Sequence, residues 1–303
     1  MALRATPTLQ LEAERLAGGL PPLLVDARRI AETVTQGEHG RRRVGPGEAF
    51  WQFRPYVPGD RPQTIDWRTS AKSDTIFVRE MEWAAAATVY LWRDPTASMT
   101  WRSDKALPTK RERADLILLA MASLLLRGGE RVALLAPGER PRSGRGALPM
   151  LAERLAREAA QDPATAKPEA ALPPPLPLPR HARALLIADF LSPLPEIEAR
   201  LRVLAQRGVA GQLLLLLDPA ETALPFDGRV RFEGLEGEGT WLVPRVEKLR
   251  DAYVERERAH EQGLADICRA LGWRLQRHLT DQPASQALLG LYQGFADNRE
   301  RRR

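Results

Sequence analysis

The stretch TVYLWRDPTASM, residues 88–99, decides how the chain is expected to fold. Its first five residues are apolar, aromatic or β-branched, which predicts a buried strand. The strand stops at Asp94, and hydroxyl side chains follow at Thr96 and Ser98. One interpretation is a cation site, because a carboxylate and two hydroxyls are hard oxygen ligands. The other is a capped turn, because aspartate, serine and threonine accept hydrogen bonds from nearby backbone N–H groups.

The segments that follow alternate between strand-like and helix-like patterns. Thr109 and Glu112 have the spacing of a capping box, which predicts the start of a helix that runs to about Arg127. Two further apolar runs end in aspartate, at Asp189 and Asp218. Strands that are apolar on both faces and separated by helices predict an α/β fold with a doubly wound, largely parallel sheet.

Asp189 supplies a second carboxylate to the predicted cation site. Ligands collect at the carboxyl ends of the strands in open parallel sheets, so Asp94 and Asp189 are expected to meet if their strands are neighbours. The predicted ligands of a Mg²⁺-type cation are therefore Asp94, Thr96, Ser98 and Asp189. Because two of these ligands are neutral, the cation would keep excess positive charge and attract a carboxylate from another molecule. Such a site would be a docking point.

Composition excludes several classes of protein. The chain has 303 residues, of which 44% are hydrophobic, enough for a substantial core. Lys and Arg exceed Asp and Glu by 45 − 39 = 6, but both signs are interspersed, so we expect no nucleic-acid partner. The single cysteine, Cys268, fits a reducing compartment, and the four histidines have no zinc-ligand spacing.

The sequence predicts a cytoplasmic protein. Residues 1–19 lack the apolar core of a signal peptide, and the most apolar helical run, 114–126, is too short to span a bilayer. We therefore expect no direct membrane span, and any location at the inner membrane would depend on recruitment by a partner.

Three regions are expected. Residues 1–82 would hold N-terminal helices and a β-rich region packed on the main domain, which spans 83–295. The segment 162–180 is rich in proline and alanine and is interpreted as a long surface loop, with a polyproline ligand as the alternative. Residues 296–303 form a basic tail.

The stretch FRPYVPGDRPQTIDWRTSAKSDTIFVRE, residues 53–80, resembles the signature of the bacterial domain-of-unknown-function family fifty-eight. The spacing of Asp94, Thr96 and Ser98 resembles the metal-ion-dependent adhesion site of von Willebrand factor A domains. The resemblance covers residues 35–220 and implies a von Willebrand factor A-like domain preceded by the signature region. Two departures stand out, because Thr96 replaces a serine and the second loop of the pattern offers only Ser143, among arginines, where a threonine is expected.

The resemblance also implies a way of working. Members of this family are thought to act as partners or adaptors of MoxR-type AAA+ ATPases, in chaperone-like assembly or maturation of client proteins. It implies no enzymatic activity and does not name the client. The chain has no phosphate-binding loop of its own, so the ATPase would supply the mechanical work.

Within the signature, Pro58, Gly59 and Asp60 predict a turn. Charged and aromatic side chains around it are interpreted either as a structural network or as a partner-binding surface, because arginine and aromatic residues are enriched in interface hot spots. The residues that carry these two interpretations are Arg54, Tyr56, Gly59, Asp60, Asp66, Trp67 and Arg79.

The alternative function is a metal-dependent phosphohydrolase that uses Asp94. Haloacid-dehalogenase-type phosphoryl transfer needs a second aspartate two positions after the nucleophile, and Thr96 stands there. The sequence therefore favours an interaction module over an enzyme.

Overall fold

The computed structural model describes residues 5–18, 44–57, 60, 63, 65–82, 87–144, 146–162 and 168–297. The chain divides into two compact units, one formed by residues 1–25 and 87–303 and the other by residues 26–86. This division differs from the expected border at residue 82, because helix α1 (Ala5–Gly18) belongs to the same unit as the main sheet.

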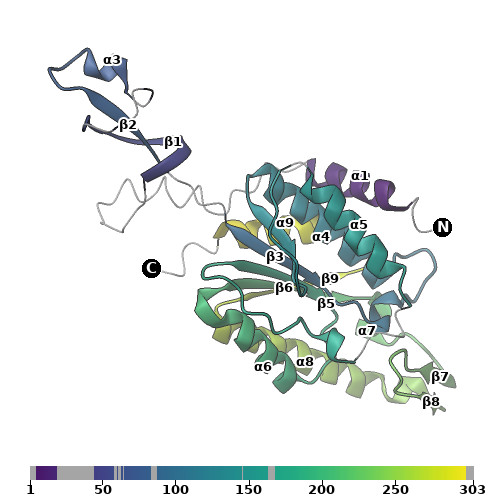
Figure 1. The fold of residues 1–303 in the computed structure, drawn as a ribbon. Coiled ribbons are helices and arrows are strands. Elements are labelled where there is room, and N and C mark those ends of the chain that lie inside the picture. The colour runs from purple at the N-terminus through teal and green to yellow at the C-terminus, as the bar shows by residue number, and fades with distance from the viewer. Residues whose placement is uncertain are drawn as a thin grey trace. The chain divides into compact units, whose positions relative to one another are not determined.

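The larger unit is built on a five-stranded sheet in which all neighbouring strands are parallel (Figure 1). The strand order is β4-β3-β5-β6-β9. This confirms the predicted doubly wound α/β fold and is the arrangement expected of a von Willebrand factor A-like domain. The strands are β3 (Thr88–Arg93), β4 (Arg131–Leu134), β5 (Arg183–Ala188), β6 (Ala210–Leu217) and β9 (Arg274–Leu279).

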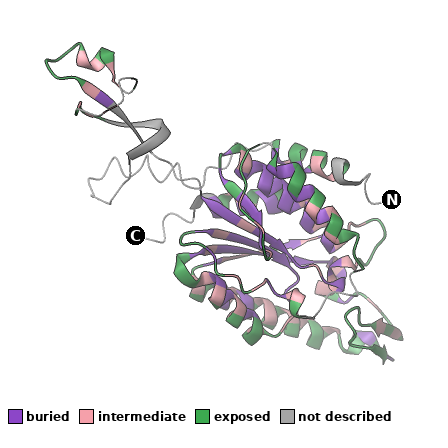
Figure 2. Ribbon diagram, in the orientation of Figure 1, coloured by how far each residue is buried: buried purple, intermediate pink, exposed green. Residues whose placement is uncertain are grey.

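Helices cover both faces of this sheet, and the strands are buried between them (Figure 2). Side chains alternate along β5, so that Leu185 and Ile187 face one core while Leu186 and Ala188 face the other. The first core is closed by α1, α4 (Lys110–Arg127), α5 (Ala147–Ala159) and α9 (Ala284–Asp297). The second is closed by α6 (Leu194–Ala205) and α8 (Arg250–Leu271).

Local sequence signals set the ends of the helices. The predicted capping box at Thr109 is present, with the hydroxyl accepting from Glu112 N and the Glu112 carboxylate accepting from Thr109 N. Helix α9 includes residues 296 and 297, where the basic tail was expected to begin, and residues 298–303 lie outside the described part.

Two features differ from the expected surface loop at 162–180. Residues Pro168–Ala171 form a short 3₁₀ helix, and Leu172 and Leu178 are buried in the second core. The segment is therefore partly packed against the sheet, because its leucines join the apolar cluster under α6. Residues 163–167 lie outside the described part.

A small antiparallel hairpin adds to the end of the unit. It consists of β7 (Val230–Glu233) and β8 (Thr240–Val243), and its own apolar cluster includes Leu224 and Val246. The short helix α7 (Pro219–Ala223) lies between β6 and this hairpin along the chain.

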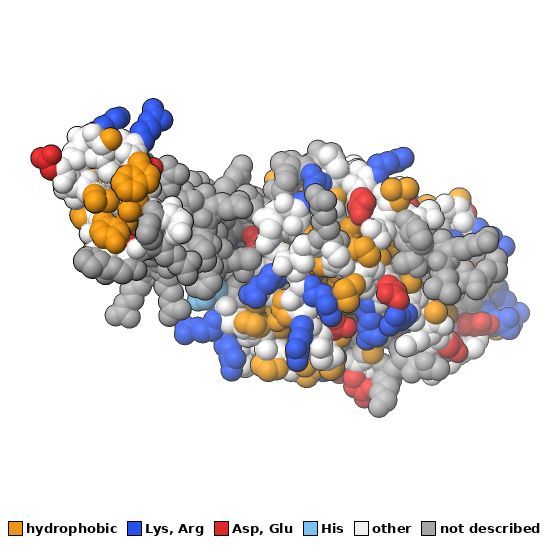
Figure 3. Space-filling view, turned by 45° about the horizontal axis from the view of Figure 1, so that its top comes forward, with side chains coloured by type: hydrophobic (Ala, Val, Ile, Leu, Met, Phe, Trp, Pro, Cys, Tyr) orange, Lys and Arg blue, Asp and Glu red, His pale blue; other side chains and the backbone are white. Residues whose placement is uncertain are grey.

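The smaller unit contains β1 (Val44–Pro55) paired antiparallel with β2 (Phe77–Glu82), and the single-turn helix α3 (Trp67–Ser70). No described helix in either unit is both long enough and apolar enough to cross a bilayer. On the face shown in Figure 3, the Lys and Arg side chains lie among acidic and apolar side chains and do not form a single basic field.

Candidate functional site

The pairing of β3 with β5 places two aspartates at one edge of the sheet. Arg93 pairs with Ile187, and Asp94 N donates to Ile187 O at 3.0 Å. Asp189 directly follows β5. In the strand order β4-β3-β5-β6-β9 the connections change direction between β3 and β5, which is the position where open α/β sheets bind ligands.

The loop after β3 gathers the hydroxyls around Asp94. Asp94 Oδ1 accepts from Thr96 N at 2.7 Å and from Thr96 Oγ1 at 2.5 Å. Ser98 Oγ lies 3.2 Å from Thr96 Oγ1. The turn-capping interpretation therefore describes one oxygen of Asp94, while the other, Oδ2, is buried without a hydrogen-bond partner.

Two arginines connect this loop and β3 to helix α4. Arg111 Nη2 donates to the carbonyl oxygens of Pro95, at 2.9 Å, and Thr96, at 3.2 Å. Arg93 is buried and forms an ion pair with the buried Asp115. Because α4 carries both Arg111 and Asp115, the helix fixes the backbone from which Asp94 and Thr96 project.

Asp189 has a partner that the sequence did not predict. The Lys110 ammonium is fully buried and donates to Asp189 Oδ2 at 2.9 Å and to Glu221 Oε1 at 2.5 Å. Burial alone would lower the pKa of Lys110, but the two carboxylates outweigh it and raise the pKa, so the lysine stays charged. The Lys110 ammonium thereby connects the first turn of α4 to the end of β5 and to α7.

Asp218, the third strand-end aspartate, has a structural role. Its Oδ1 accepts from Ala220 N at 2.9 Å and caps α7, while its Oδ2 accepts from Ser103 N at 2.9 Å. Glu221 completes the reciprocal capping box by accepting from Asp218 N at 2.7 Å.

The electrostatics of the edge are unbalanced around Asp94. Burial, followed by the negative charge of Asp189, raises the pKa of Asp94 to about 7. The two hydrogen bonds from Thr96 lower it in part, and the charge of Glu236 raises it again. The site therefore holds a carboxylate whose charged form is disfavoured by burial and by the neighbouring negative charges.

The oxygen atoms of this loop suit weak binding of a small hard cation. The free Asp94 Oδ2 and the hydroxyls of Thr96 and Ser98 are oxygen donors, whereas Asp189 Oδ2 already faces Lys110. Within the described ranges, no three Asp, Glu, His or Cys side chains converge as a ready-made metal site. A cation held here would depend on one carboxylate and neutral oxygens, so an additional acidic ligand would strengthen it.

The second loop does not complete the adhesion-site pattern. Arg142 forms an antiparallel bridge with Val132, near the start of β4. Ser143 therefore follows the loop toward the amino end of β4, whereas Asp94 and Asp189 lie at the carboxyl ends of their strands. Arg140 and Arg142 belong to the same returning loop, and Arg145 lies outside the described part.

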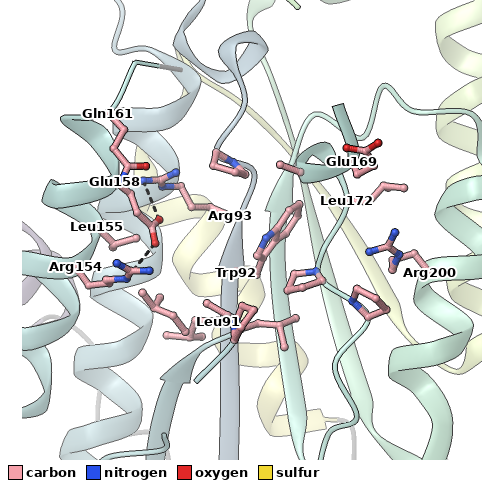
Figure 4. A pocket seen from close by; sticks show the side chains of 18 of the residues that line it. Leu91, Trp92, Arg93, Arg154, Leu155, Glu158, Gln161, Glu169, Leu172 and Arg200 are labelled. Atoms are coloured by element: carbon pink, nitrogen blue, oxygen red, sulfur yellow. Dashed lines mark ion pairs between the residues drawn. The ribbon is translucent and has the colours of Figure 1, made fainter. Parts of the chain in front are cut away.

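Two cavities open at this edge. One, of about 450 Å³, is lined by Ser98, Asp189 and Glu236 among others. The second, of about 570 Å³, lies at the ends of β3 and β4, with Trp92 between a wall that carries Arg93 and Glu158 and the opposite wall (Figure 4). The cavities share the wall residues Glu169, Leu172 and Arg200.

Three charged groups that line the larger cavity are engaged with one another. Glu158 Oε2 lies 3.7 Å from Arg93 Nη2, and Glu158 Oε1 lies 3.3 Å from Arg154 Nε (Figure 4). Arg200 Nη1, on the opposite wall, donates to Pro173 O at 2.9 Å. This cavity is therefore a mainly apolar hollow beside the candidate site, with its walls held by internal ion pairs.

In the smaller unit, part of the predicted signature network is present. Arg54 forms a bidentate ion pair with Asp60, with both N–O distances 2.6 Å. Hydrogen bonds from Arg54 and from Val57 N lower the pKa of Asp60 to about 2. Asp66 instead caps α3 by accepting from Thr69 N at 2.8 Å.

The aromatic side chains of the signature differ in their burial. The side chain of Trp67 is 65% exposed, because it begins a single-turn helix with no buried residue. Tyr56 is half-buried, and its backbone N donates to Ile76 O at 2.7 Å. Gly59 and the side chain of Arg79 lie outside the described part.

Three residues of the site escaped the sequence analysis. Lys110 had a usable signal, because a cation in the first turn of a helix is unfavourable unless a buried acid compensates for it. Glu221 could have been found as the third residue of a capping box after Asp218. Glu236 had no signal, since its contact spans 138 residues.

Removing the Lys110 ammonium should destabilise the larger unit. Lys110→Met keeps the length of the side chain but leaves Asp189 and Glu221 buried without a counter-charge, which we expect to lower the free energy of unfolding by about 3–5 kcal/mol. Urea unfolding measures this change in the free energy of unfolding. Lys105→Met, at an exposed lysine, is the matched control, and an equal small loss in both variants would contradict the assignment.

Neutralising Asp94 should stabilise the fold in a pH-dependent way. Because the folded-state pKa is about 7 and the ordinary value is 3.8, the folded state binds more protons between these values and loses stability as the pH rises. Without divalent cations, Asp94→Asn should be more stable than the wild type at pH 8, on the order of 2 kcal/mol, and nearly equal to it at pH 4. Thermal or urea unfolding across this range, with the exposed Asp251→Asn as control, would refute the claim if all three curves were parallel.

Two mycobacterial proteins are similar to this chain over most of its length. They are Rv1480 of Mycobacterium tuberculosis (strain H37Rv) and Mb1516 of Mycobacterium bovis, and both are described as uncharacterized. Each is 27% identical over 281 residues, covering 90% of this chain and 87% of its own length.

Two solved structures are more distant. They are an aerotolerance-related membrane protein from Bacteroides fragilis, with a TM-score of 0.42, and the conserved hypothetical protein BatB from Bacteroides thetaiotaomicron, with a TM-score of 0.37. Both are 14% identical, covering 69% and 70% of this chain and 98% of theirs. The model of the family "Protein of unknown function DUF58" matches residues 52–263, which include the last residues of β1, all of β2, and the strand ends that carry Asp94 and Asp189. The chain belongs to the DUF58 family.

Proposed function

We propose that this DUF58 protein is a non-enzymatic interaction module that docks an acidic partner through a Mg²⁺-type cation at the β3–β5 edge, and that it acts as an adaptor for a MoxR-type AAA+ ATPase. The observation that carries the proposal is the buried, unpartnered Oδ2 of Asp94 beside the hydroxyls of Thr96 and Ser98. A buried charged oxygen without a partner is costly, and a cation would offset that cost.

The residues divide the work at this edge. Asp94, Thr96 and Ser98 would hold the cation, while Arg111 keeps their loop in position. Asp189 adds negative charge that favours a cation, but Lys110 keeps its Oδ2 engaged. When bound, the cation would supply a Lewis-acidic position for a carboxylate of the partner. Without the cation, the acidic side chains of this edge would repel that carboxylate.

The smaller unit offers a second place for partner contact. Four of its large apolar side chains are exposed, including Trp67, and an arginine lies close by in the bidentate pair of Arg54 with Asp60. Exposed tryptophan and ordered arginine are typical of interface hot spots, so we assign the signature unit to partner recognition. The exposed set is Phe53, Val57, Trp67 and Ile76.

The phosphohydrolase alternative gains no support from the geometry. A nucleophilic Asp94 would need to reach a substrate phosphorus, but the residue is 0% exposed and its Oδ1 is held by Thr96. Thr96 also occupies the position where that chemistry needs a second carboxylate.

The adaptor proposal predicts cation-dependent binding to the ATPase. Biolayer interferometry between the purified full chain and a MoxR-type ATPase of the same organism should show binding in Mg²⁺ that falls at least tenfold in EDTA. Asp94→Ala should bind as weakly in Mg²⁺ as the wild type does in EDTA, because the variant lacks the charged ligand.

Asp251→Ala, an exposed acid on α8, is the control and should bind like the wild type. Binding that is unchanged by EDTA and by Asp94→Ala would remove the cation from the mechanism, and absence of binding under every condition would remove the ATPase.

A further inference from the structure

A carboxylate of this same chain already reaches the candidate site. Glu236 lies between β7 and β8, and its Oε1 accepts from Ser98 N at 3.1 Å. Ser98 is one of the predicted cation ligands, and Glu236 acts on Asp94 through space as a negative charge. The hairpin therefore places an acid where the proposed function calls for a carboxylate from another molecule.

The tip of the hairpin is built to present this side chain. Gly234 N donates to Gly239 O at 2.7 Å and closes the turn, and Glu236 N donates to Glu238 Oε2 at 2.9 Å. Gly237 has a φ of +95°, a backbone conformation that residues with a side chain rarely adopt. This conformation lets the chain reverse immediately after Glu236. Glu236 itself is exposed, so a small movement of its side chain needs no repacking of the core.

The tip also forms part of the wall of the cavity of about 450 Å³ that opens beside the site. Glu236 and Glu238 line it together with Ser98 and Asp189. Lys110 compensates the charge of Asp189, and Arg200 also lines this cavity, but the buried Oδ2 of Asp94 at the neighbouring strand end has no hydrogen-bond partner. This unpartnered oxygen points to a ligand of positive charge at the strand edge beside the hairpin.

We propose that Glu236 is an internal acidic ligand of the cation site, so that the tip of the β7–β8 hairpin occupies the place of a partner's carboxylate and must be displaced when the partner docks. The inference rests on the proposed function, which supplies the cation. It adds a residue that holds the cation in the unpartnered protein and a segment that regulates access to it.

The consequence is a graded competition. A partner carboxylate must displace a tethered carboxylate, whose effective concentration at the site is high because it belongs to the same chain. A free carboxylate in solution would not displace Glu236, whereas the carboxylate of a partner that also contacts other surfaces of the protein would displace it. The hairpin thereby raises the selectivity of the site for acidic groups presented by a matching protein surface.

The test uses Mn²⁺ as the probe and the full-length protein at pH 8, where Asp94 is ionised. Titration calorimetry measures Mn²⁺ affinity, and water-proton relaxation measures how many exchangeable waters the bound Mn²⁺ keeps. Glu236→Gln should lower the affinity roughly tenfold and raise the relaxation enhancement, because a water takes the place of the carboxylate. Glu233→Gln is the matched control, since it removes the same charge from β7 without contacting Ser98, and it should behave like the wild type.

Added acetate sharpens the result. In Glu236→Gln, acetate should lower the relaxation enhancement by displacing that water, whereas the wild type should not respond. Equal affinity and equal enhancement in all three proteins would overturn the role of Glu236 while leaving the cation site in place. Absence of Mn²⁺ binding in all three would overturn the cation site as well, and circular dichroism checks that each variant is folded.

Discussion

A buried ammonium group connects the elements that form the carboxyl edge of the sheet. Lys110 opens α4, Asp189 ends β5 and Glu221 lies in α7, and the lysine donates to both acids. Charges this deeply buried are stable only when they compensate for one another, so the three residues must come together as the domain folds. The position of α4 then determines where Arg111 holds the Asp94 loop.

The same arrangement limits what the site can bind. Because Lys110 engages Asp189, the carboxylate oxygen left without a hydrogen-bond partner at the loop is Oδ2 of Asp94. A full set of carboxylates would bind a cation tightly and leave it with little need of a partner. One carboxylate with two hydroxyls would leave a cation short of negative charge, which suits the proposed recruitment of an acid. In the proposed arrangement, Glu236 would supply such an acid from within the chain when no partner is present.

Several parts of the structure followed from local patterns. The apolar run before Asp94 became β3, the run before Asp189 became β5, and the capping box at Thr109 began α4. These predictions succeeded because they depend on hydrophobic periodicity and on hydrogen bonds between residues three positions apart. The burial of Trp67 and of the proline-rich segment did not follow from local patterns, because exposure depends on packing. Trp67 is exposed, whereas Leu172 and Leu178 lie inside a core.

By itself the sequence determined the class of the fold, the strand ends that carry aspartate and the hydroxyls that surround Asp94, since each is encoded within a few neighbouring residues. Only the tertiary structure decided that Lys110 pairs with Asp189 and that the Glu236 carboxylate accepts from Ser98 N. It also decided that Ser143 lies away from the carboxyl edge of the sheet. These contacts join residues 79 and 138 positions apart, or depend on the path of a returning loop. Their energies come from burial and charge compensation, which exist only once the sheet and its helices have assembled.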